Sequence, residues 1–549
     1  KEYPPNYVFY YDDPRGKFQS IYGTPVSRFS SRNNKEFRKE VRMHGGKQLY
    51  ESDINPIFRC FEENYKDAVA PELQTAFFDI EVDFDKERGF SPTHDPFNAI
   101  TAISVYLNWL DQLVTLAVPP KSLSMTTAQE LVAEFDNTFL FDNEADMLKM
   151  FLELIDDADV LSGWNSEGYD IPYTVNRITR ILSKDDTRKF CLWGQFPKPR
   201  KFERFGAEQQ TYDLIGRVHM DYMQLYRKYT YEERHSYSLD AIAEHELGER
   251  KTQFEGTLDQ LYNQHFKTFI AYNRQDTALL DKLDKKLQFL DLANTLAHAN
   301  TVLLQTTMGA VAVTDQAIIN EAHERGMVVP NRKQQLTDDN TQAAGAYVAY
   351  PKKGMSEWIG SVDINSLYPS AIRAMNMGPE TVIGQLRPIM TDRYIKDKIA
   401  GGASFAAAWE GLFGSLEYTA VMEQQRGTEI TVDWQDGETN VYSASEMWAI
   451  VFDSNRPWIL SANGTILTYE KEGIIPGLLK RWYSERKEMQ AKKRDAKDKK
   501  EEAFWDKRQL VKKINLNSLY GAILNPGCRF FDHRIGQSTT LTGRAIAKH

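Results

Sequence analysis

The sequence predicts an α/β protein of several domains. Its 549 residues exceed what a single hydrophobic core usually organises, so we expect more than one folding unit. Apolar and acidic residues alternate over Ala76–Val82 as they do in a strand, whereas Val175, Ile178 and Ile181 follow the spacing of a helix. Hydrophobic residues make up 42% of the chain and charged residues 26%, which is the ordinary balance of a globular protein.

The composition excludes several classes of protein. Cys60, Cys191 and Cys528 are odd in number and far apart, which indicates neither a disulfide framework nor a zinc motif. The sequence contains neither a signal peptide nor an apolar run of membrane-spanning length, so we expect a soluble intracellular protein with no membrane partner. An isoelectric point of about 5.7 is not that of a protein that coats DNA. Nucleic acid would have to be met through local basic surfaces.

The first strand carries two acids on one face. Asp79 and Glu81 alternate with Phe78, Ile80 and Val82, and the apolar flanks predict that the strand is buried. Two adjacent buried carboxylates repel each other and lose hydration, which costs several kcal/mol unless a partner compensates. A divalent cation is the simplest compensation. The alternative is an edge strand with solvated acids.

Two further motifs carry acids that follow later in the chain. Asp170 comes after a turn rich in Gly, Asn and Ser and before a helical pattern; taken alone, it is better explained as a helix-capping acid than as a metal ligand. Tyr272 and Asp276 stand four residues apart in the helical stretch Phe269–Leu280, so they share one helix face. Taken alone, that pair is an ordinary helix-surface contact.

The three motifs together predict a carboxylate cage for two divalent metals, a type of site that cleaves phosphodiesters. Oxygen ligands favour Mg²⁺ or Mn²⁺ over zinc. Two such ions about 4 Å apart activate a water and stabilise the leaving oxygen. The phenol of Tyr272 would orient that water.

A second constellation begins at Ile359–Ser370, which predicts a strand, a turn and a helix with Asp363 at the strand end. Pro369 favours a helix start, and the backbone N–H groups of the turn would hold phosphate oxygens while Asp363 binds metal. The alternative is a capped turn with a structural aspartate.

The constellation continues in Lys513–Gly521, where a helix would bring Lys513, Asn517 and Tyr520 to one face. The lysine suits a phosphate, and Gly521 allows close approach because it has no Cβ. A solvated helix with a buried tyrosine is the alternative.

The acidic motifs resemble the 3′→5′ proofreading exonuclease domain of family B DNA polymerases, most closely the branch of T4-type tailed phages. The match continues through Phe141–Glu144 and Ser236–Ile242. The resemblance implies a ribonuclease-H-like fold and two Mg²⁺ ions per active site, with Mn²⁺ as the substitute. It implies that Tyr272 assists the attacking water and that four carboxylates bind the metals: Asp79, Glu81, Asp170 and Asp276.

The second constellation resembles the polymerase motifs of the same family. The resemblance implies that Asp363 binds metal and that Tyr368 lies under the sugar, where its ring would collide with a 2′-hydroxyl. Lys480 to Lys513 holds 14 Lys and Arg against 7 Asp and Glu, and it matches the fingers. The phage branch has a basic residue where this chain has Gln490, so one triphosphate contact is missing or moves to Lys492 or Lys493. The other implied contacts are Ser366, Leu367, Arg486, Lys487, Lys513 and Asn517 with the nucleotide, and Tyr520 and Gly521 with template and primer.

The second palm motif, centred on Asp-Thr-Asp, and the thumb are absent from the sequence. We expect a fragment or the N-terminal half of a split polymerase that does not extend a primer by itself. The expected domains are a remnant N-terminal domain (1–75), the exonuclease (76–288), a return to the N-terminal domain (289–334), the first part of the palm (335–472), helical fingers (473–525) and a truncated second part of the palm (526–549).

The predicted function is that of a phage-type replicative DNA polymerase with proofreading. Two alternatives remain open: a 3′→5′ exonuclease only, or a non-catalytic scaffold for primer-template DNA. The implied partners are primer-template and single-stranded DNA, deoxynucleoside triphosphates, a possible C-terminal polymerase half and, for the full-length family, a sliding clamp whose binding tail lies outside this chain. The implied location is the cytoplasm of a bacterial host. A hairpin with its turn at Gly206, within 200–212, would help to part primer from template.

Overall fold

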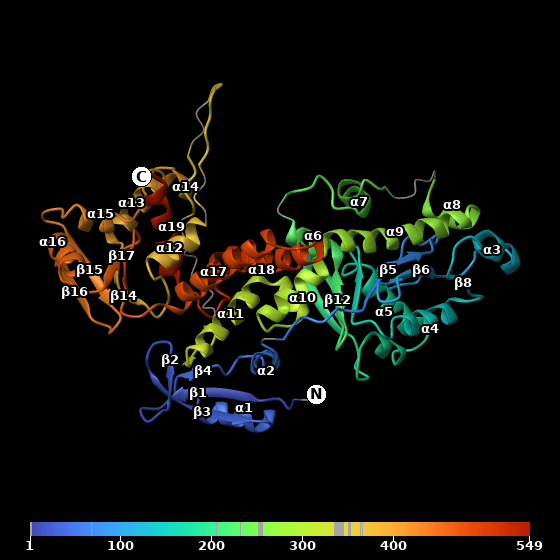
Figure 1. Ribbon diagram of the computed structural model, residues 1–549, viewed down its shortest axis with the longest axis horizontal. Coiled ribbons are helices and arrows are strands. Elements are labelled where there is room, and N and C mark those ends of the chain that lie inside the picture. Colours follow the sequence, from blue (N-terminus) through green and yellow to red (C-terminus); the bar gives the residue numbers. More distant parts are fainter. Residues whose placement is uncertain are drawn as a thin grey trace. The chain divides into compact units, whose positions relative to one another are not determined.

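The computed structural model describes residues 3–66, 68–204, 206–230, 232–250, 256–333, 345–349, 353–362, 364 and 366–548. They form two compact units (Figure 1). The six-stranded unit comprises residues 69–294, and the discontinuous unit combines residues 1–68 with residues 295–549. Both units mix helices and strands, which confirms the predicted α/β class.

The six-stranded unit is built on one mixed sheet with the order β12-β9-β5-β6-β7-β8. Strands β5, β6 and β7 form an antiparallel meander, β9 runs parallel to β5, and β12 runs parallel to β9. A meander extended on one side by parallel strands is the sheet of a ribonuclease-H-like fold, as predicted. The strands are β5 (Thr75–Val82), β6 (Ile100–Leu107), β7 (Gln112–Ala117), β8 (Thr138–Leu140), β9 (Val160–Gly163) and β12 (Val218–Asp221).

Helices cover both faces of this sheet. Phe78 and Ile80 of β5 point into a core that also contains side chains of α4 (Glu144–Leu154) and α5 (Asp170–Ile181). On the other face, α9 (Phe266–Leu287) packs through Phe269 and Ile270 onto alanines of β6 and β7. Because strand side chains alternate, the acids of β5 face α9. The remaining helices are α3 (Met125–Val132), the 3₁₀ helix η1 (Asp186–Phe190), α6 (Tyr222–Tyr229), α7 (Leu239–Leu247), α8 (Leu258–Gln264) and α10 (Phe289–Ala299), which spans the boundary with the other unit.

The predicted hairpin is present. Strands β10 (Lys198–Arg204) and β11 (Ala207–Asp213) pair antiparallel from Lys198↔Asp213 to the turn. Gly206 has a φ of +75°, a left-handed conformation that glycine adopts without strain.

The discontinuous unit begins with a five-stranded sheet of order β13-β2-β3-β1-β4. Strand β13 comes from the segment after α11 and runs parallel to β2, so the chain returns to its N-terminal sheet. The elements are β1 (Tyr7–Asp12), β2 (Phe18–Ser20), β3 (Pro25–Ser31), α1 (Asn34–Met43), β4 (Leu49–Tyr50), α2 (Pro56–Tyr65), the 3₁₀ helix η2 (Leu304–Met308), α11 (Ala310–Glu324) and β13 (Met327–Val328).

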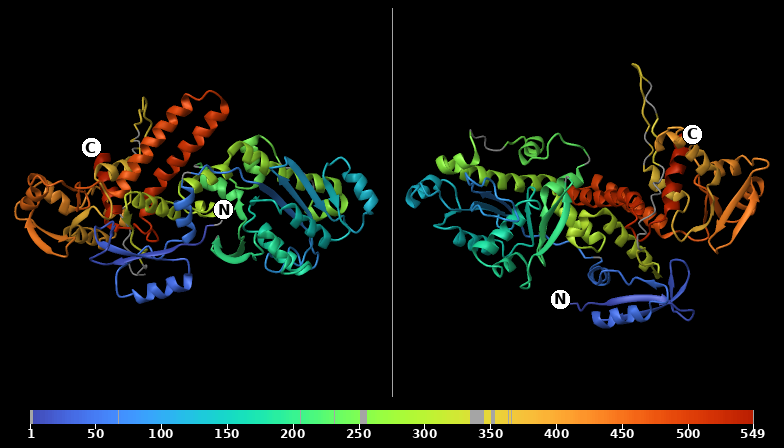
Figure 2. Two further views of the ribbon diagram at one scale, coloured as in Figure 1. Left: turned by 60° about the horizontal axis from the view of Figure 1, so that its bottom comes forward. Right: turned by 180° about the vertical axis from the view of Figure 1, so that it is seen from behind.

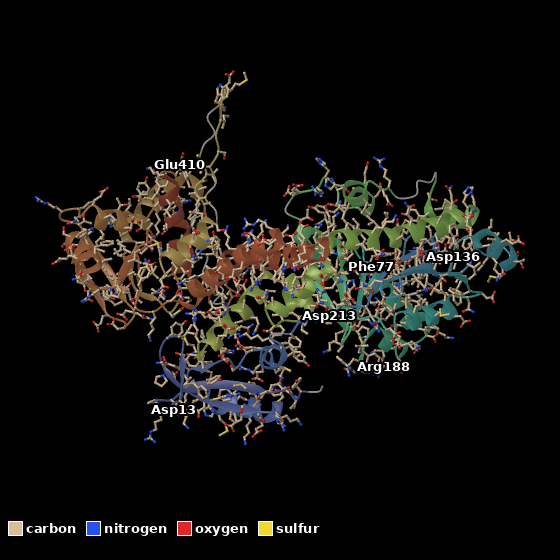
Figure 3. The ribbon with its side chains drawn as sticks, viewed as in Figure 1. Asp13, Phe77, Asp136, Arg188, Asp213 and Glu410 are labelled. Carbon is tan, nitrogen blue, oxygen red and sulfur yellow. The ribbon has the colours of Figure 1, made fainter. Side chains whose placement is uncertain are left out.

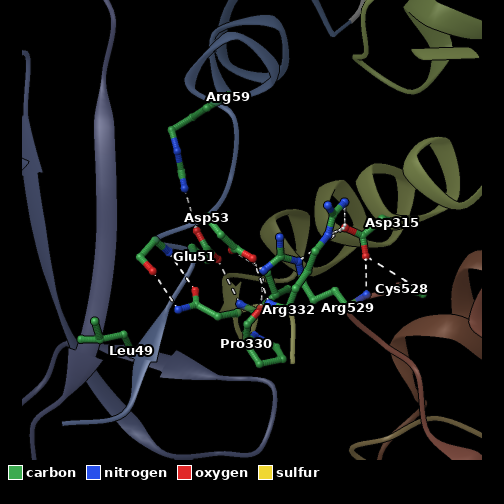
Figure 4. A network of polar contacts seen from close by, with 12 residues as sticks. Leu49, Glu51, Asp53, Arg59, Asp315, Pro330, Arg332, Cys528 and Arg529 are labelled. Atoms are coloured by element: carbon green, nitrogen blue, oxygen red, sulfur yellow. Dashed lines mark hydrogen bonds and ion pairs between the residues drawn. The ribbon is translucent and has the colours of Figure 1, made fainter. Parts of the chain in front are cut away.

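A buried polar network ties three distant segments of this unit together (Figure 4). Arg529 donates to Asp53 Oδ1 and to the Pro330 carbonyl, each at 2.6 Å. Its backbone N–H donates to Asp315 Oδ1 at 2.9 Å, and the other oxygen of that carboxylate accepts from Arg332 at 3.0 Å. The guanidinium of Arg529 is almost wholly buried, so these charges act with little solvent screening.

A second buried group joins the N-terminal sheet to α11. Glu51 accepts from Arg59 at 2.9 Å and contacts His323 Nε2 at 2.9 Å, while His323 Nδ1 lies 2.8 Å from Glu62. Burial alone would raise the pKa of Glu51, but the bond from His323 and the nearby cations hold that pKa at about 2. Burial likewise opposes protonation of His323, yet its two glutamate partners raise its pKa to about 9.

The rest of the discontinuous unit holds an antiparallel sheet and a long helical pair. The sheet has the order β16-β15-β14-β18-β17, and α17 and α18 lie side by side as a helical hairpin (Figure 2). No helix in the described part of the chain is long and apolar enough to cross a membrane. The elements are α12 (Leu367–Ala374), β14 (Val382–Leu386), α13 (Ile389–Ala400), α14 (Phe405–Ala408), α15 (Leu416–Met422), β15 (Glu429–Trp434), β16 (Thr439–Ser443), α16 (Ala444–Trp448), the π-helix η3 (Ala449–Asp453), β17 (Trp458–Leu460), β18 (Thr465–Thr468), α17 (Ile474–Arg494), α18 (Lys499–Ile523) and α19 (His533–Lys548).

The strand predicted before Asp363 is wrong. Described residues 353–362 form no strand, and no described strand pairs with them. Trp358 is 99% exposed and Val362 is 94% exposed. A strand needs a neighbour for its backbone hydrogen bonds, and the alternation of residue types says nothing about whether that neighbour is there.

We expect the stability of the discontinuous unit to depend on the charge of His323. The folded-state pKa lies above the usual 6.5, so the contribution is complete below pH 6.5 and is lost as the pH rises through about 9. A shift of this size corresponds to about 3 kcal/mol. The melting temperature of the wild-type chain should therefore fall between pH 6.5 and 10 by several degrees more than that of His323→Gln.

Calorimetry at both pH values measures this difference. His245→Gln, at an exposed histidine, is the matched control and should keep the wild-type pH dependence. Equal slopes for wild type and His323→Gln would contradict the assignment.

Candidate active sites

Three carboxylates meet between β5 and α9. Asp79 and Glu81 come from β5 and Asp276 from α9, and one oxygen from each lies within 4.8 Å of the others. Glu81 and Asp276 are buried and Asp79 is half-buried. Phe77, labelled in Figure 3, lies on the same face of the strand and packs against Tyr222. A buried set of oxygen donors alone fits a hard divalent cation, which would offset the mutual repulsion of the acids.

Asp170, the first residue of α5, contacts the same strand. Its Oδ1 accepts from the Ile80 N–H at 3.3 Å, so it lies beside the backbone between the two acids of β5. Burial, followed by repulsion from Asp221, raises the pKa of Asp170 to about 7. The helix-capping alternative is wrong, because Tyr169 holds the N-cap position of α5 and no side chain caps that helix end.

The loop that delivers Asp170 is fixed by two residues of β12. Asp221 accepts from the backbone N–H groups of Asn165 at 3.1 Å and Glu167 at 3.2 Å. His219 Nε2 lies 2.8 Å from the Ser166 hydroxyl. Burial, followed by repulsion from a nearby arginine, lowers the pKa of His219 to about 3, so the imidazole is neutral. Burial also raises the pKa of Asp221, to about 6.

Close packing at the start of this loop leaves room only for glycine. A Cβ at Gly163 would lie 2.8 Å from the Phe78 carbonyl oxygen and 2.9 Å from the Ser166 Cβ. The glycine therefore lets the loop press against β5, which sets where Asp170 begins its helix.

The α9 face adds one residue that the sequence analysis missed. Asn273 is fully buried, and its Nδ2 donates to Asp79 Oδ2 at 3.0 Å. Its Oδ1 has no hydrogen-bond partner within the described residues, which costs about 1–3 kcal/mol. The Asn273 side chain thus positions Asp79 through its N–H group while its own carbonyl oxygen stays without a hydrogen bond among the described residues. Its position three residues before Asp276, on the same helix face, was the signal available in the sequence. Tyr272 is half-buried one turn before Asp276.

The two polymerase-type motifs meet within the discontinuous unit. The rings of Tyr368 on α12 and Tyr520 on α18 stack with centroids 4.5 Å apart. The hydroxyl of Tyr520 lies 2.6 Å from that of Thr540 on α19. A Cβ at Gly543 would lie 2.8 Å from the Tyr368 ring, so α19 packs directly against it. The stack joins residues that are 152 positions apart in the sequence.

The other described residues of these motifs belong to the same two helices or to the N-terminal cap of α12. Ser366 has a φ of +54° at the start of α12, followed by Leu367, and Asp363 lies outside the described residues. On α18, Lys513 is half-buried and Asn517 is exposed; a Cβ at Gly521 would meet no described atom within 4 Å.

The two residues of α17 predicted to contact a triphosphate have different surroundings. Arg486 Nε donates to Gln509 at 3.4 Å, and Lys487 is exposed with its ammonium 5.6 Å from the centre of the Tyr483 ring. Lys493 pairs with Asp506 at 2.8 Å and Lys492 lies over Trp505. Both lysines therefore contact α18. This disfavours either of them as a replacement for the basic residue expected at position 490, where this chain has Gln490.

Comparison with known proteins gives matches over both units. The family model described as DNA polymerase family B, exonuclease domain, matches residues 34–242, and that described as DNA polymerase family B matches residues 301–549. The chain is 27% identical to the DNA-directed DNA polymerase of Enterobacteria phage T4, over 74% of this chain and 45% of that protein. It is 25% identical to that of Escherichia phage RB69, over 96% of this chain and 60% of that protein. The chain is also 25% identical to the DNA polymerase of Paramecium bursaria Chlorella virus NY2A, over 96% of this chain and 57% of that protein. The chain thus spans about half the length of the curated relatives it matches.

We expect Asn273→Ala to weaken divalent-metal binding at the carboxylate cluster by about tenfold to a hundredfold, the usual effect of losing a residue that orients a metal ligand. Titration with Mn²⁺ followed by electron paramagnetic resonance measures this without any reaction. Asn263→Ala, at an exposed asparagine of α8, is the matched control. Equal affinities in the two variants would rule out the role of Asn273.

Proposed function

We propose, because the chain belongs to DNA polymerase family B, that it carries the proofreading 3′→5′ exonuclease site and part of the nucleotide site of a phage-type DNA-directed DNA polymerase. The observation that carries the proposal is the carboxylate cluster on β5 and α9, in the unit that the exonuclease family model largely covers. An intact buried acidic cluster also argues against a non-catalytic scaffold, since such a cluster is costly without a cation.

The cluster would hold two Mg²⁺ ions, with Mn²⁺ as a substitute, and such ions activate a water and stabilise the leaving oxygen of a phosphodiester. Asp79, Glu81, Asp170 and Asp276 are the proposed ligands. The phenol of Tyr272, one turn before Asp276, would accept or donate a hydrogen bond to orient the water. Burial of the acids lowers the local dielectric and strengthens each contact to the cation.

For the nucleotide site, we assign the Tyr368 ring to the sugar. The stack on Tyr520 and the contact with Gly543 hold that ring rigidly, as a steric filter against a 2′-hydroxyl requires. The open space at Gly521 fits a templating base. We further assign Asp363 to metal binding, Tyr520 to the template and primer, and the triphosphate contacts to Ser366, Leu367, Arg486, Lys487, Lys513 and Asn517.

The proposed partners are single-stranded and primer-template DNA and deoxynucleoside triphosphates, with action in the cytoplasm of a bacterial host and a sliding clamp for the whole polymerase. We assign the exonuclease to residues 69–294, and the N-terminal domain to residues 1–68 with the return through β13. The palm and fingers would occupy the remainder.

We expect Asp79→Ala and Asp276→Ala each to slow 3′→5′ degradation of end-labelled single-stranded DNA by at least about a hundredfold, since each metal contributes several kcal/mol of charge stabilisation. Asp157→Ala, at an exposed aspartate of the same unit, should cut at the wild-type rate. Undiminished cleavage by the Asp79→Ala, Glu81→Ala double variant would refute the assignment.

We expect the chain to bind dATP more tightly than ATP and Tyr368→Ala to lose most of that preference, because only the ring excludes the 2′-hydroxyl. Tyr368→Phe keeps the ring and should keep the preference. Equilibrium dialysis with both nucleotides measures the ratio. An unchanged ratio in Tyr368→Ala would show that the ring serves packing instead.

A further inference from the structure

One surface segment of the six-stranded unit differs in charge from the chain as a whole. Residues 184–201 contain six Lys and Arg and two Asp, a net charge of +4 in a chain of net charge −10. Part of this charge is paired: Arg188 lies 3.2 Å from Asp185, and Arg200 is held by Glu167 and Asp213. The segment includes η1 and leads into β10.

A tryptophan projects from the middle of this segment. Trp193 is 77% exposed, and its φ of +55° is a left-handed conformation that bulky residues rarely adopt. The loop around it is nevertheless fixed: the Leu192 N–H donates to the Ile215 carbonyl at 2.8 Å, and the Gln195 N–H donates to the Leu192 carbonyl at 3.2 Å. The backbone thus holds a large aromatic ring toward solvent where burial would ordinarily be favourable.

The backbone at Gly216 packs closely against this loop. Gly216 has a φ of +85°, and a Cβ there would lie 2.7 Å from the Leu192 Cβ and 2.9 Å from Cζ3 of the Trp193 ring. The glycine therefore allows one side of the ring to rest against the backbone while the rest of the ring stays open to solvent.

Cations surround a second aromatic ring close by in sequence. The Arg188 guanidinium, labelled in Figure 3, lies 3.7 Å from the centre of the Phe196 ring, and the Lys184 ammonium lies 5.5 Å from it. Phe196 is half-buried and orders the two long side chains, while about two-fifths of the Arg188 side chain stays exposed.

We propose that Trp193, with Lys184 and Arg188, forms a binding surface for single-stranded DNA. An exposed, rigid aromatic ring stacks on an unpaired base, and flanking cations bind the phosphates on either side. The bases of a duplex are already stacked on each other, so the ring selects single strands. The charge favours a polyanion over a protein partner.

The surface rests on the proposed function and adds to it a place where the DNA strand is held. The segment that carries the surface is joined to the loop before Asp170 at its far end: Arg200 bonds Glu167 at 2.6 Å, and Glu167 stands three residues before Asp170. A strand bound at Trp193 would thus be held by the same unit that carries the carboxylate cluster.

The test uses the full chain carrying Asp79→Ala, without metal, and the fluorescence anisotropy of a labelled sixteen-residue oligothymidylate. Trp193→Ala should weaken binding by about tenfold, the effect of losing one base stacked on an aromatic ring. Trp193→Phe should retain most of the affinity. Phe90→Ala removes another exposed aromatic ring of the same unit and is the matched control.

Three further arms keep the test decisive. Gly216→Ala leaves the indole in place but displaces its loop, and should weaken binding in the same direction. The Lys184→Ala, Arg188→Ala double variant should reduce the slope of log affinity against log salt by about 1.4. An oligonucleotide without bases should bind wild type and Trp193→Ala equally. Wild-type affinity in Trp193→Ala, or tighter binding of the baseless strand by the wild type, would overturn the proposal.

Cleavage by the chain with its acids intact separates this inference from the proposed function. Trp193→Ala should raise KM for a long single strand and leave kcat unchanged, because the residue binds DNA away from the reacting bond. A chain that binds through Trp193 but cuts nothing would refute the exonuclease and keep the binding surface. If the chain cuts DNA and Trp193→Ala leaves KM unchanged, the binding surface is refuted and the exonuclease is kept.

Discussion

The six-stranded unit depends on holding four carboxylates around one strand. β5 is suited to this because Phe78 and Ile80 anchor it in the core while Asp79 and Glu81 face α9. The backbone of the same strand fixes the fourth acid, since the Ile80 N–H binds Asp170. The acids repel one another, so a rigid framework must hold them together. They lie on the central strand β5, in the first turn of α5 and in the interior of α9.

Two buried acids of the chain have opposite pKa shifts because their neighbours differ. Glu51 is buried beside His323 and Arg59, and its pKa falls to about 2 despite burial. Asp170 is buried as deeply, but its partners are a backbone N–H and another acid, and its pKa rises to about 7. The charge of Glu51 is compensated by protein cations, whereas burial beside another acid disfavours the charged form of Asp170. The two buried acids therefore differ in role because of their neighbours.

The sequence predicted the members of this cluster because each motif is local: alternation pairs Asp79 with Glu81, and helical spacing pairs Tyr272 with Asp276, while the meeting of the two motifs is a property of the fold. It missed Asp221, whose role arises from a contact 56 residues away. It also missed Asn273, whose place on the helix face was visible but whose contact with Asp79 spans 194 residues. The strand predicted at Ile359 failed for the same reason, since a strand forms only against a partner that the local pattern does not specify. The tyrosine stack lies between these cases: each motif was visible, but their contact was a property of the fold.

The acidic cluster and the basic segment would act on an approaching phosphodiester at two different distances. A phosphodiester that approaches buried carboxylates is repelled until cations screen them, and bound ions act only over the first few ångströms. Farther out, the attraction must come from the protein, yet the chain as a whole is acidic. Residues 184–201 concentrate positive charge within the same unit, and the surface proposed there would attract a DNA strand. In that proposal the exposed ring of Trp193 would add affinity that salt does not screen, which a charged surface alone cannot supply.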